Sequence, residues 1–263
     1  MNAAFFHRYK SLITTFVCLL IFMAYALCSN GVIDEGDAIN HYLISRFAFD
    51  HPRLLLDLWG KPLFTLLTAP FAAFGFKGVL IFNVLAGTTT AYITYRSAKK
   101  MKLTNAFLVI PVVLFCPVFF RSILAGHTEV LCALIFISSV YLMQNKRYAS
   151  AALLASLLPF SRPEGYIILA FFAIAFLLKK RMRYLPLLCT GFLIYTLIGW
   201  FHYGDILWIL HKSPYDFGND LYGHGDPWHF IRSYRGIVGN PIVFIMCLGI
   251  LMLIANPFIH DRS

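Results

Sequence analysis

Long apolar runs separated by short charged turns make up most of the chain. The first run, residues 11–28, follows His7, Arg8 and Lys10 and has roughly the 20 residues that a helix needs to cross a bilayer. Because this run is longer than the core of a signal peptide, we expect it to be retained as a span, although residues 26–28 would also serve as a cleavage site.

Further apolar segments follow along the chain, at residues 63–76, 79–95, 103–120, 123–143, 148–160, 166–178, 184–203 and 236–259. The first of these is short and contains Pro70 and Gly75, so we expect it to lie obliquely or to dip into the membrane. The pattern predicts an all-α integral membrane protein. We expect a polytopic helical bundle of about 7–8 transmembrane helices, with residues 1–263 as a single transmembrane domain.

Two polar intervals interrupt this pattern, at residues 29–62 and 204–235. Within the first, residues 38–49 and 53–59 carry apolar side chains at helical spacing, which predicts two short amphipathic helices on the membrane surface, with a solvated loop as the alternative. The second interval mixes carboxylates and histidines with Trp and Tyr. Such a mixture is typical of a carbohydrate or lipid-headgroup site, and also of any membrane interface.

Composition and charge support the membrane prediction and give it a direction. Hydrophobic residues make up 59% of the chain and charged residues 13%, whereas the formal net charge is +10. Along the predicted path, the amino-terminal side of the membrane carries a charge of +12 and the opposite side −2. Basic residues favour the cytoplasmic side, so both polar intervals are expected outside the cytoplasm, most simply at a bacterial inner membrane. This placement explains the positive charge without nucleic acid as a partner.

The cysteines give no metal or disulfide pattern. All six lie in or beside apolar segments, and none forms a CxxC pair. We therefore expect neither a zinc site nor a disulfide framework.

Candidate chemistry begins at the two ends of the first polar interval. Asp34, Glu35 and Asp37 open it, and Lys61 closes it immediately before the next apolar segment. An acidic cluster after a span is often only a solvated helix end, and a lysine at a membrane boundary often only places its charge at the interface. Together, however, these residues put opposite charges at the two ends of one outer loop.

A second group of polar residues lies at the outer turn between residues 103–120 and 123–143. It consists of Arg121, His127 and Glu129. A histidine and an acid two residues apart can bind a metal ion or orient a hydroxyl group, although this spacing is more often a polar turn.

A third group is Arg162 and Glu164, in the turn at residues 161–165. The flanking apolar segments have 13 residues each, so each reaches only about 20 Å against a hydrocarbon core of about 30 Å. We therefore expect the turn to lie below the outer surface, where charged side chains are tolerated if they line a cavity. The alternative is a simple Arg162–Glu164 pair that stabilises a kink.

The order of these features resembles the C-type (GT-C) glycosyltransferases. A first span is followed by Asp34-Glu35 at the start of a long outer loop, and then by Lys61-Pro62-Leu63 before a broken apolar segment. The protein O-mannosyltransferase and aminoarabinose transferase group is the most similar, and the likeness covers roughly residues 1–200. Gly60 departs from the pattern, because an acid often precedes the lysine, and the chain has fewer spans than most of the superfamily.

This resemblance implies an enzyme that moves a sugar from a polyprenyl-phosphate donor to a lipid, glycan or protein acceptor on the extracytoplasmic side. It implies that Asp34 is the catalytic or metal-adjacent acid, that Lys61 contacts the lipid phosphate, and that an acid placed like Glu129 completes the polar site. No cofactor is assigned, and a divalent metal ion stays open.

The residues and the resemblance together give one set of expected site residues. They are, for catalysis, Asp34, Glu35 and Asp37; for the donor phosphate, Lys61, Arg162 and Arg121; and for substrate binding, His127, Glu129 and Glu164. A polytopic transporter or lipid flippase with an intramembrane Arg/Glu site is the alternative, although the internal repeat expected of it is not evident. A non-catalytic assembly subunit would leave the acids on one face unexplained.

The charge distribution predicts the orientation of the chain in the membrane. In a cysteine-free variant, cysteines introduced at Asn40 and Asn219 should react with an impermeant thiol reagent in intact cells, and a cysteine at Asn145 should react only after permeabilisation. Reaction at Asn145 together with protection at Asn40 would reverse the predicted topology.

Overall fold

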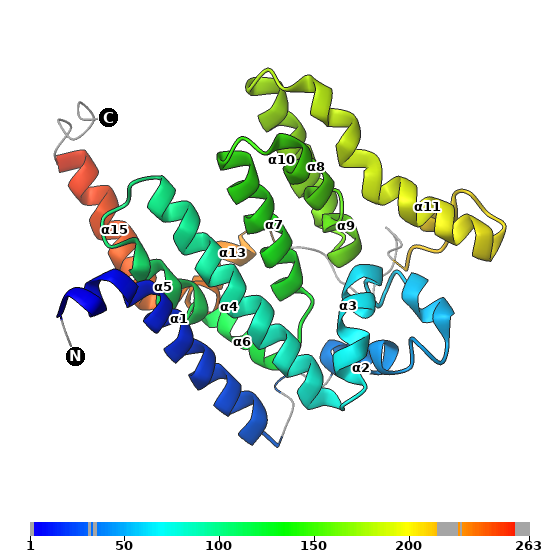
Figure 1. Ribbon diagram of the computed structural model, residues 1–263, viewed down its shortest axis with the longest axis horizontal. Helices are drawn as coiled ribbons and strands as arrows, with labels where there is room; N and C mark the ends of the chain where they lie inside the picture. The colour runs from blue at the N-terminus through cyan, green and yellow to red at the C-terminus, as the bar shows by residue number, and fades with distance from the viewer. Residues whose placement is uncertain (1–2, 31–32, 34–35, 215–225, 227, 256–263) are drawn as a thin grey trace.

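The computed structural model describes residues 3–30, 33, 36–214, 226 and 228–255, and every regular element in these residues is helical. Figure 1 shows the helices as one assembly without a sheet in the described part. The all-α prediction is thereby confirmed. Three helical stretches are long and apolar enough to cross a membrane, and a bent pair can count as a fourth; the three are Tyr9–Cys28, Phe76–Lys100 and Met182–Tyr203.

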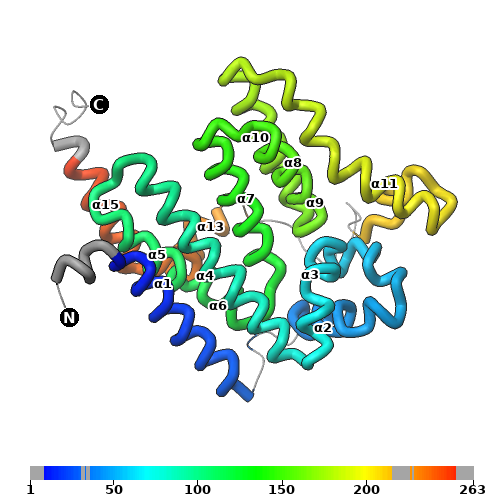
Figure 2. Tube along the Cα trace, viewed as in Figure 1, coloured from blue at the N-terminus to red at the C-terminus, as the bar shows by residue number. Residues whose placement is uncertain are grey.

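Helix α4 (Phe76–Lys100) lies at the centre and packs against α1 (Ala3–Cys28) and α7 (Glu129–Gln144). Gly87 of α4 lies close to two other parts of the chain: a Cβ added there would lie 2.6 Å from Ile123 Cδ1 and 3.6 Å from Val130 Cγ1 of α7. Figure 2 shows α1 and α4 on one side of the trace and the later helices α8, α10 and α11 on the other, with α7 between them.

The predicted span at residues 103–120 is broken in the structure. It consists of η2 (Ala106–Leu108), α5 (Val109–Leu114) and α6 (Pro117–Ala125), and the axes on the two sides of the break differ by 59°. The reason is local: Pro117 cannot donate a helical hydrogen bond, and Cys116 before it has the extended backbone that proline favours.

The next predicted segment, residues 123–143, is also divided. Gly126 ends α6 in the left-handed region, with φ of 77°, so α7 starts only at Glu129. Asn83 of α4 holds this turn, because its Nδ2 donates to the backbone carbonyl of His127 at 2.9 Å.

The first polar interval contains helices shorter than the two predicted. They are α2 (Asp37–Arg46) and η1 (Pro52–Leu56), and α3 (Pro62–Ala72) follows. Helix α2 buries Ala38, His41 and Ser45, which share one helical face. Ser45 Oγ lies 2.8 Å from Thr68 Oγ1 of α3, so a buried hydrogen bond joins α2 to the helix that follows the interval. The position of α2 and η1 on a membrane surface stays a prediction.

The second half of the chain forms helices around the other side of α7. They are α8 (Tyr148–Ala155), α9 (Leu158–Ser161), α10 (Gly165–Leu178), η3 (Met182–Cys189), α11 (Thr190–Tyr203) and α12 (Trp208–His211). The last described residues form α13 (His229–Arg232), α14 (Tyr234–Ile237) and α15 (Asn240–Ala255). A buried core of large side chains, among them Phe64, Phe160 and Phe176, joins α3, α9 and α10.

Gly165 sets the angle of the turn between α9 and α10. A Cβ added there would lie 2.3 Å from the carbonyl carbon of Leu158, so we expect Gly165→Ala to lower stability by about 1–3 kcal/mol through overpacking. The measurement is the melting temperature in detergent. Gly249→Ala in α15 is the matched control, because nothing lies within 4 Å of its added Cβ. Equal melting temperatures for the two variants would show that this packing is not tight.

Candidate functional site

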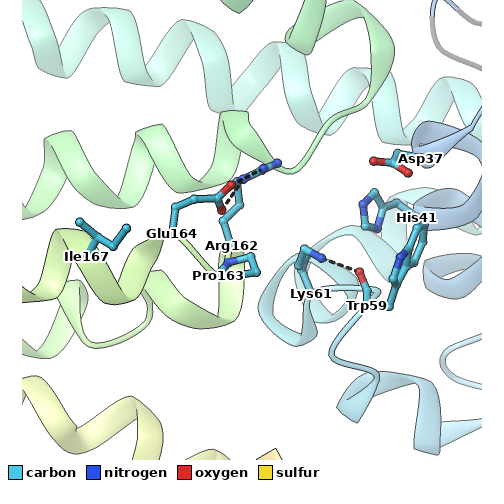
Figure 3. Close-up of a pocket in the computed structure, with 8 residues that line it drawn as sticks. All are labelled: Asp37, His41, Trp59, Lys61, Arg162, Pro163, Glu164 and Ile167. Carbon is cyan, nitrogen blue, oxygen red and sulfur yellow. Dashed lines mark hydrogen bonds and ion pairs between the residues drawn. The ribbon is translucent and has the colours of Figure 1, made fainter. Parts of the chain in front are cut away.

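A cavity of about 490 Å³ lies between the first polar interval and the turn that joins α9 to α10. Figure 3 shows side chains from α2 and from the loop before α3 on one side, and from the α9–α10 turn on the other. The lining residues are Asp37, His41, Trp59, Lys61, Arg162, Pro163, Glu164 and Ile167. The fold therefore brings together two of the polar groups that the sequence analysis had singled out separately.

Lys61 occupies an unusual backbone conformation in this cavity. Its φ is 61°, a region that costs a non-glycine residue on the order of 1–3 kcal/mol. The side chain is 6% exposed, and its Nζ donates to the backbone carbonyl of Trp59 at 2.9 Å. Burial and, next, the positive charge of Arg162 lower the pKa of Lys61 to about 8, while the charges of Asp37 and Glu164 oppose the shift.

Gly60 lets the loop before Lys61 pack closely against α2. A Cβ at Gly60 would lie 2.8 Å from the Ile44 Cγ2 of α2. The backbone is also engaged on both sides, because its N–H donates to Asp57 Oδ1 at 2.7 Å and its carbonyl accepts from Thr65 Oγ1 at 2.9 Å. The loop packs so closely on α2 that an acidic side chain has no room here.

His41 lines the cavity although the sequence analysis did not single it out. Its ring stacks on Trp59, with 4.9 Å between the ring centroids, and its buried Nδ1 has no hydrogen-bond partner among the described residues. Burial, followed by the charge of Lys61, lowers the pKa of His41 to about 3, so the ring is neutral at physiological pH. In the sequence, the feature that could have identified His41 is its position one helical turn after Asp37.

Arg162 is held by two carboxylates. Its Nη1 lies 2.6 Å from Glu129 Oε1 at the start of α7, and its Nη2 lies 2.8 Å from Glu164 Oε1. Burial opposes the charge of Arg162, but the hydrogen bond to Glu164 and the charge of Glu129 raise its pKa above the usual range. The same hydrogen bond lowers the pKa of Glu164. Any anion that binds Arg162 must therefore compete with two carboxylates.

This geometry answers several of the sequence expectations. Arg162 and Glu164 form the pair that was the simpler alternative, and they line a cavity as well. Glu129 is not among the lining residues, so it acts on the cavity through Arg162. The depth of this turn in a membrane stays a prediction.

The remaining expected residues lie away from the cavity lining or outside the described residues. Arg121 is exposed on α6, and His127 lies in the turn before α7, close enough to affect the pKa of His41. Neither lines the cavity. Asp34 and Glu35 lie outside the described residues.

The described lining of the cavity offers few metal ligands. Within the described residues, no three His, Cys, Asp or Glu side chains lie together as a metal site would require. Among the described lining residues, Asp37 and Glu164 are the two that supply carboxylate oxygens. The described donor set does not make a complete metal site.

A second cavity, of about 310 Å³, adjoins the first and has a different character. The two share Lys61 and Pro163. The rest of its lining is mostly apolar and consists of Leu58, Pro62, Pro159, Phe160, Tyr166, Ile209, Ser213 and Pro214. A polar and an apolar cavity thus meet at a buried lysine, an arrangement that suits a molecule with an anionic group between a polar head and an apolar tail.

The lowered pKa of Lys61 can be measured directly. With lysines carrying ¹³C-methyl groups, the NMR signal that disappears in Lys61→Arg should titrate near pH 8 in the folded chain. Because the pKa is lower in the folded than in the unfolded chain, the unfolded chain binds more protons between the two values. Stability should therefore rise between about pH 8 and about pH 10.5, and this rise should be absent in Lys61→Met. Titration of the assigned signal near pH 10.5 would contradict the burial of the charge.

No family model, curated protein or solved structure matches the chain.

Proposed function

We propose that the chain is a membrane glycosyltransferase that moves a sugar from a polyprenyl-phosphate donor to an acceptor on the extracytoplasmic side. The observation that carries this proposal is the meeting of the two cavities at Lys61. The polar cavity offers carboxylates and cations beside an aromatic ring, and the adjoining cavity offers an apolar surface.

The two cavities fit the parts of such a donor. The phosphate would bind at Lys61, the isoprenoid tail would leave through the apolar cavity toward the bilayer, and the sugar would lie in the polar cavity. Trp59 supplies an apolar ring for the C–H face of a sugar, and Glu164, which is more than half exposed, can accept hydrogen bonds from its hydroxyl groups. His41 is neutral and adds a polar contact without charge.

The reaction requires a base and stabilisation of the leaving group. A carboxylate takes the proton of the acceptor hydroxyl, the hydroxyl oxygen bonds to the anomeric carbon, and the bond from that carbon to the phosphate oxygen breaks. The phosphate leaves with the electron pair, stabilised by the charge of Lys61. Within the acidic cluster, Asp37 lines the cavity, whereas the family resemblance favours Asp34.

The finer topology belongs to the same proposal. The shorter apolar helices, including Glu129–Gln144, Tyr148–Ser161 and Gly165–Leu178, would add crossings to the longer ones and bring the number of spans to about 7–8. The charge asymmetry of the chain supports a position of the cavity outside the cytoplasm, at a bacterial inner membrane. Acceptors in that location include lipids, glycans and proteins.

Substitution of the base should lower turnover, whereas substitution of the phosphate-binding lysine should mainly weaken donor binding. Asp37→Asn keeps the size of the side chain and removes the base, so turnover should fall by about 10²- to 10⁴-fold while donor affinity changes little. Lys61→Ala removes a charge that attracts the phosphate before and during the reaction, so its main effect should be weaker donor binding. Both are measured with a purified donor in a direct transfer assay.

The controls separate the candidate acids and the candidate cations. Loss of turnover in Asp34→Asn, with near-normal turnover in Asp37→Asn, would assign the role of base to Asp34. Retained turnover in each of the three variants of Asp34, Glu35 and Asp37 would contradict the proposed sugar transfer. Lys77→Ala is the matched lysine control, because Lys77 is exposed and its Nζ donates only to the Leu27 carbonyl among the contacts described.

Donor affinity should also decline above about pH 8 in the unsubstituted chain and not in Lys61→Arg.

A further inference from the structure

Three basic turns form one continuous surface at the end of the bundle away from the cavity. Arg96 Nη2 near the end of α4 donates to the Tyr141 hydroxyl of α7 at 3.0 Å, and Ser97 Oγ lies 2.9 Å from Gln144 Oε1. Lys100 also contacts Asn145 in the turn between α7 and α8. The end of α4 is thereby joined to the α7–α8 turn.

The α7–α8 turn is joined in the same way to the turn between α10 and η3. The guanidinium of Arg181 lies 5.1 Å from the ring centroid of Tyr148, the first residue of α8. The Tyr148 ring lies 5.6 Å from that of Tyr184 in η3. In Figure 1 the upper ends of α7 and α10 lie away from α2 and α3. We call the three turns together, residues 96–102, 145–148 and 179–184, the basic surface.

The basic surface has no acidic residue of its own. The sequence contains no Asp or Glu between Asp57 and Glu129, between Glu129 and Glu164, or between Glu164 and Asp205. The ion pairs of the described residues involve Arg162, His211 and Arg232 instead. Within the described part of the chain, its positive charges are therefore not neutralised by a carboxylate.

Tyrosine rings hold several of these cations in place. Arg96 lies 5.6 Å from the ring centroid of Tyr141, and Arg183 lies 4.8 Å from that of Tyr184 and donates to its hydroxyl at 2.6 Å. A guanidinium has five N–H donors, so a single bond to a hydroxyl leaves donors for an oxyanion. Contact with an aromatic face also limits the freedom of the side chain, which lowers the entropic cost of binding an anion.

We propose that the basic surface binds the phosphate groups of anionic phospholipids in the leaflet it faces. Two of the stretches long enough to cross a membrane, Phe76–Lys100 and Met182–Tyr203, have one end in this surface, which places its charges at the level of lipid headgroups. Basic turns that only set topology need no fixed arrangement, whereas here the α7–α8 turn contacts each of the other two and three arginines lie over tyrosine rings. This inference is independent of the proposed sugar transfer.

The test is competitive lipid binding to the purified full-length chain. In an equimolar mixture of phosphatidylglycerol and phosphatidylcholine, native mass spectrometry should show roughly fivefold or more phosphatidylglycerol than phosphatidylcholine bound to the chain. A ratio of this size corresponds to the effect of about one basic residue near an anionic surface. The double variant Arg181→Gln/Arg183→Gln should lose at least roughly fivefold of this preference. Higher ionic strength should reduce the preference of the unsubstituted chain.

Two further variants separate a defined surface from total charge. Arg232→Gln/Arg235→Gln removes the same charge from exposed arginines outside the basic surface and should keep the preference. Arg181→Lys/Arg183→Lys retains the charge and should keep most of it. Equal retention of the two lipids by the unsubstituted chain would overturn the proposal, and this result needs no variant to fold. So would an equal loss in the two Gln pairs, which would assign the effect to net charge.

Discussion

The pairing of Arg162 with Glu129 and Glu164 is the interaction on which the site depends. A half-buried guanidinium at the end of apolar helices is tolerated because two carboxylates neutralise it, one from the start of α7 and one from its own turn. The pairing requires α7 to begin at Glu129, which follows from the left-handed Gly126, and it requires the tight α9–α10 turn that Gly165 permits. Backbone geometry at two glycines thus decides where the charges of the cavity lie.

Lys61 complements this arrangement from the other side of the cavity. It is buried in a loop that Gly60 packs against α2, and its backbone conformation is one that few non-glycine residues adopt. The lysine also lines both the polar cavity and the apolar one. Its low pKa and its strained backbone are costs to folding, and in the proposed function they place a cation where a lipid phosphate and a sugar would meet.

Much of this site could be predicted from the sequence, because charged residues are conspicuous between apolar segments. Asp37, Lys61, Arg162 and Glu164 were singled out by that contrast, and the structure places all four around one cavity. Their distances did not follow, because they depend on how α2 packs across the bundle. His41 was missed because the burial of its ring against Trp59 is a tertiary property. The break at Pro117 was missed because hydropathy averages over it, although proline gave a local warning.

The central claim is that the two cavities hold a sugar linked to a lipid phosphate and transfer the sugar. The most direct measurement is incubation of the purified chain, in vesicles with a membrane extract as acceptor and with divalent metal ions supplied, with a panel of radiolabelled polyprenyl-phosphate sugars. We expect at least one donor to lose its label to the acceptor and to yield free polyprenyl phosphate, and we expect Lys61→Ala to reduce this transfer greatly at limiting donor. Failure to consume any donor of the panel, by a chain that retains its fold, would contradict it.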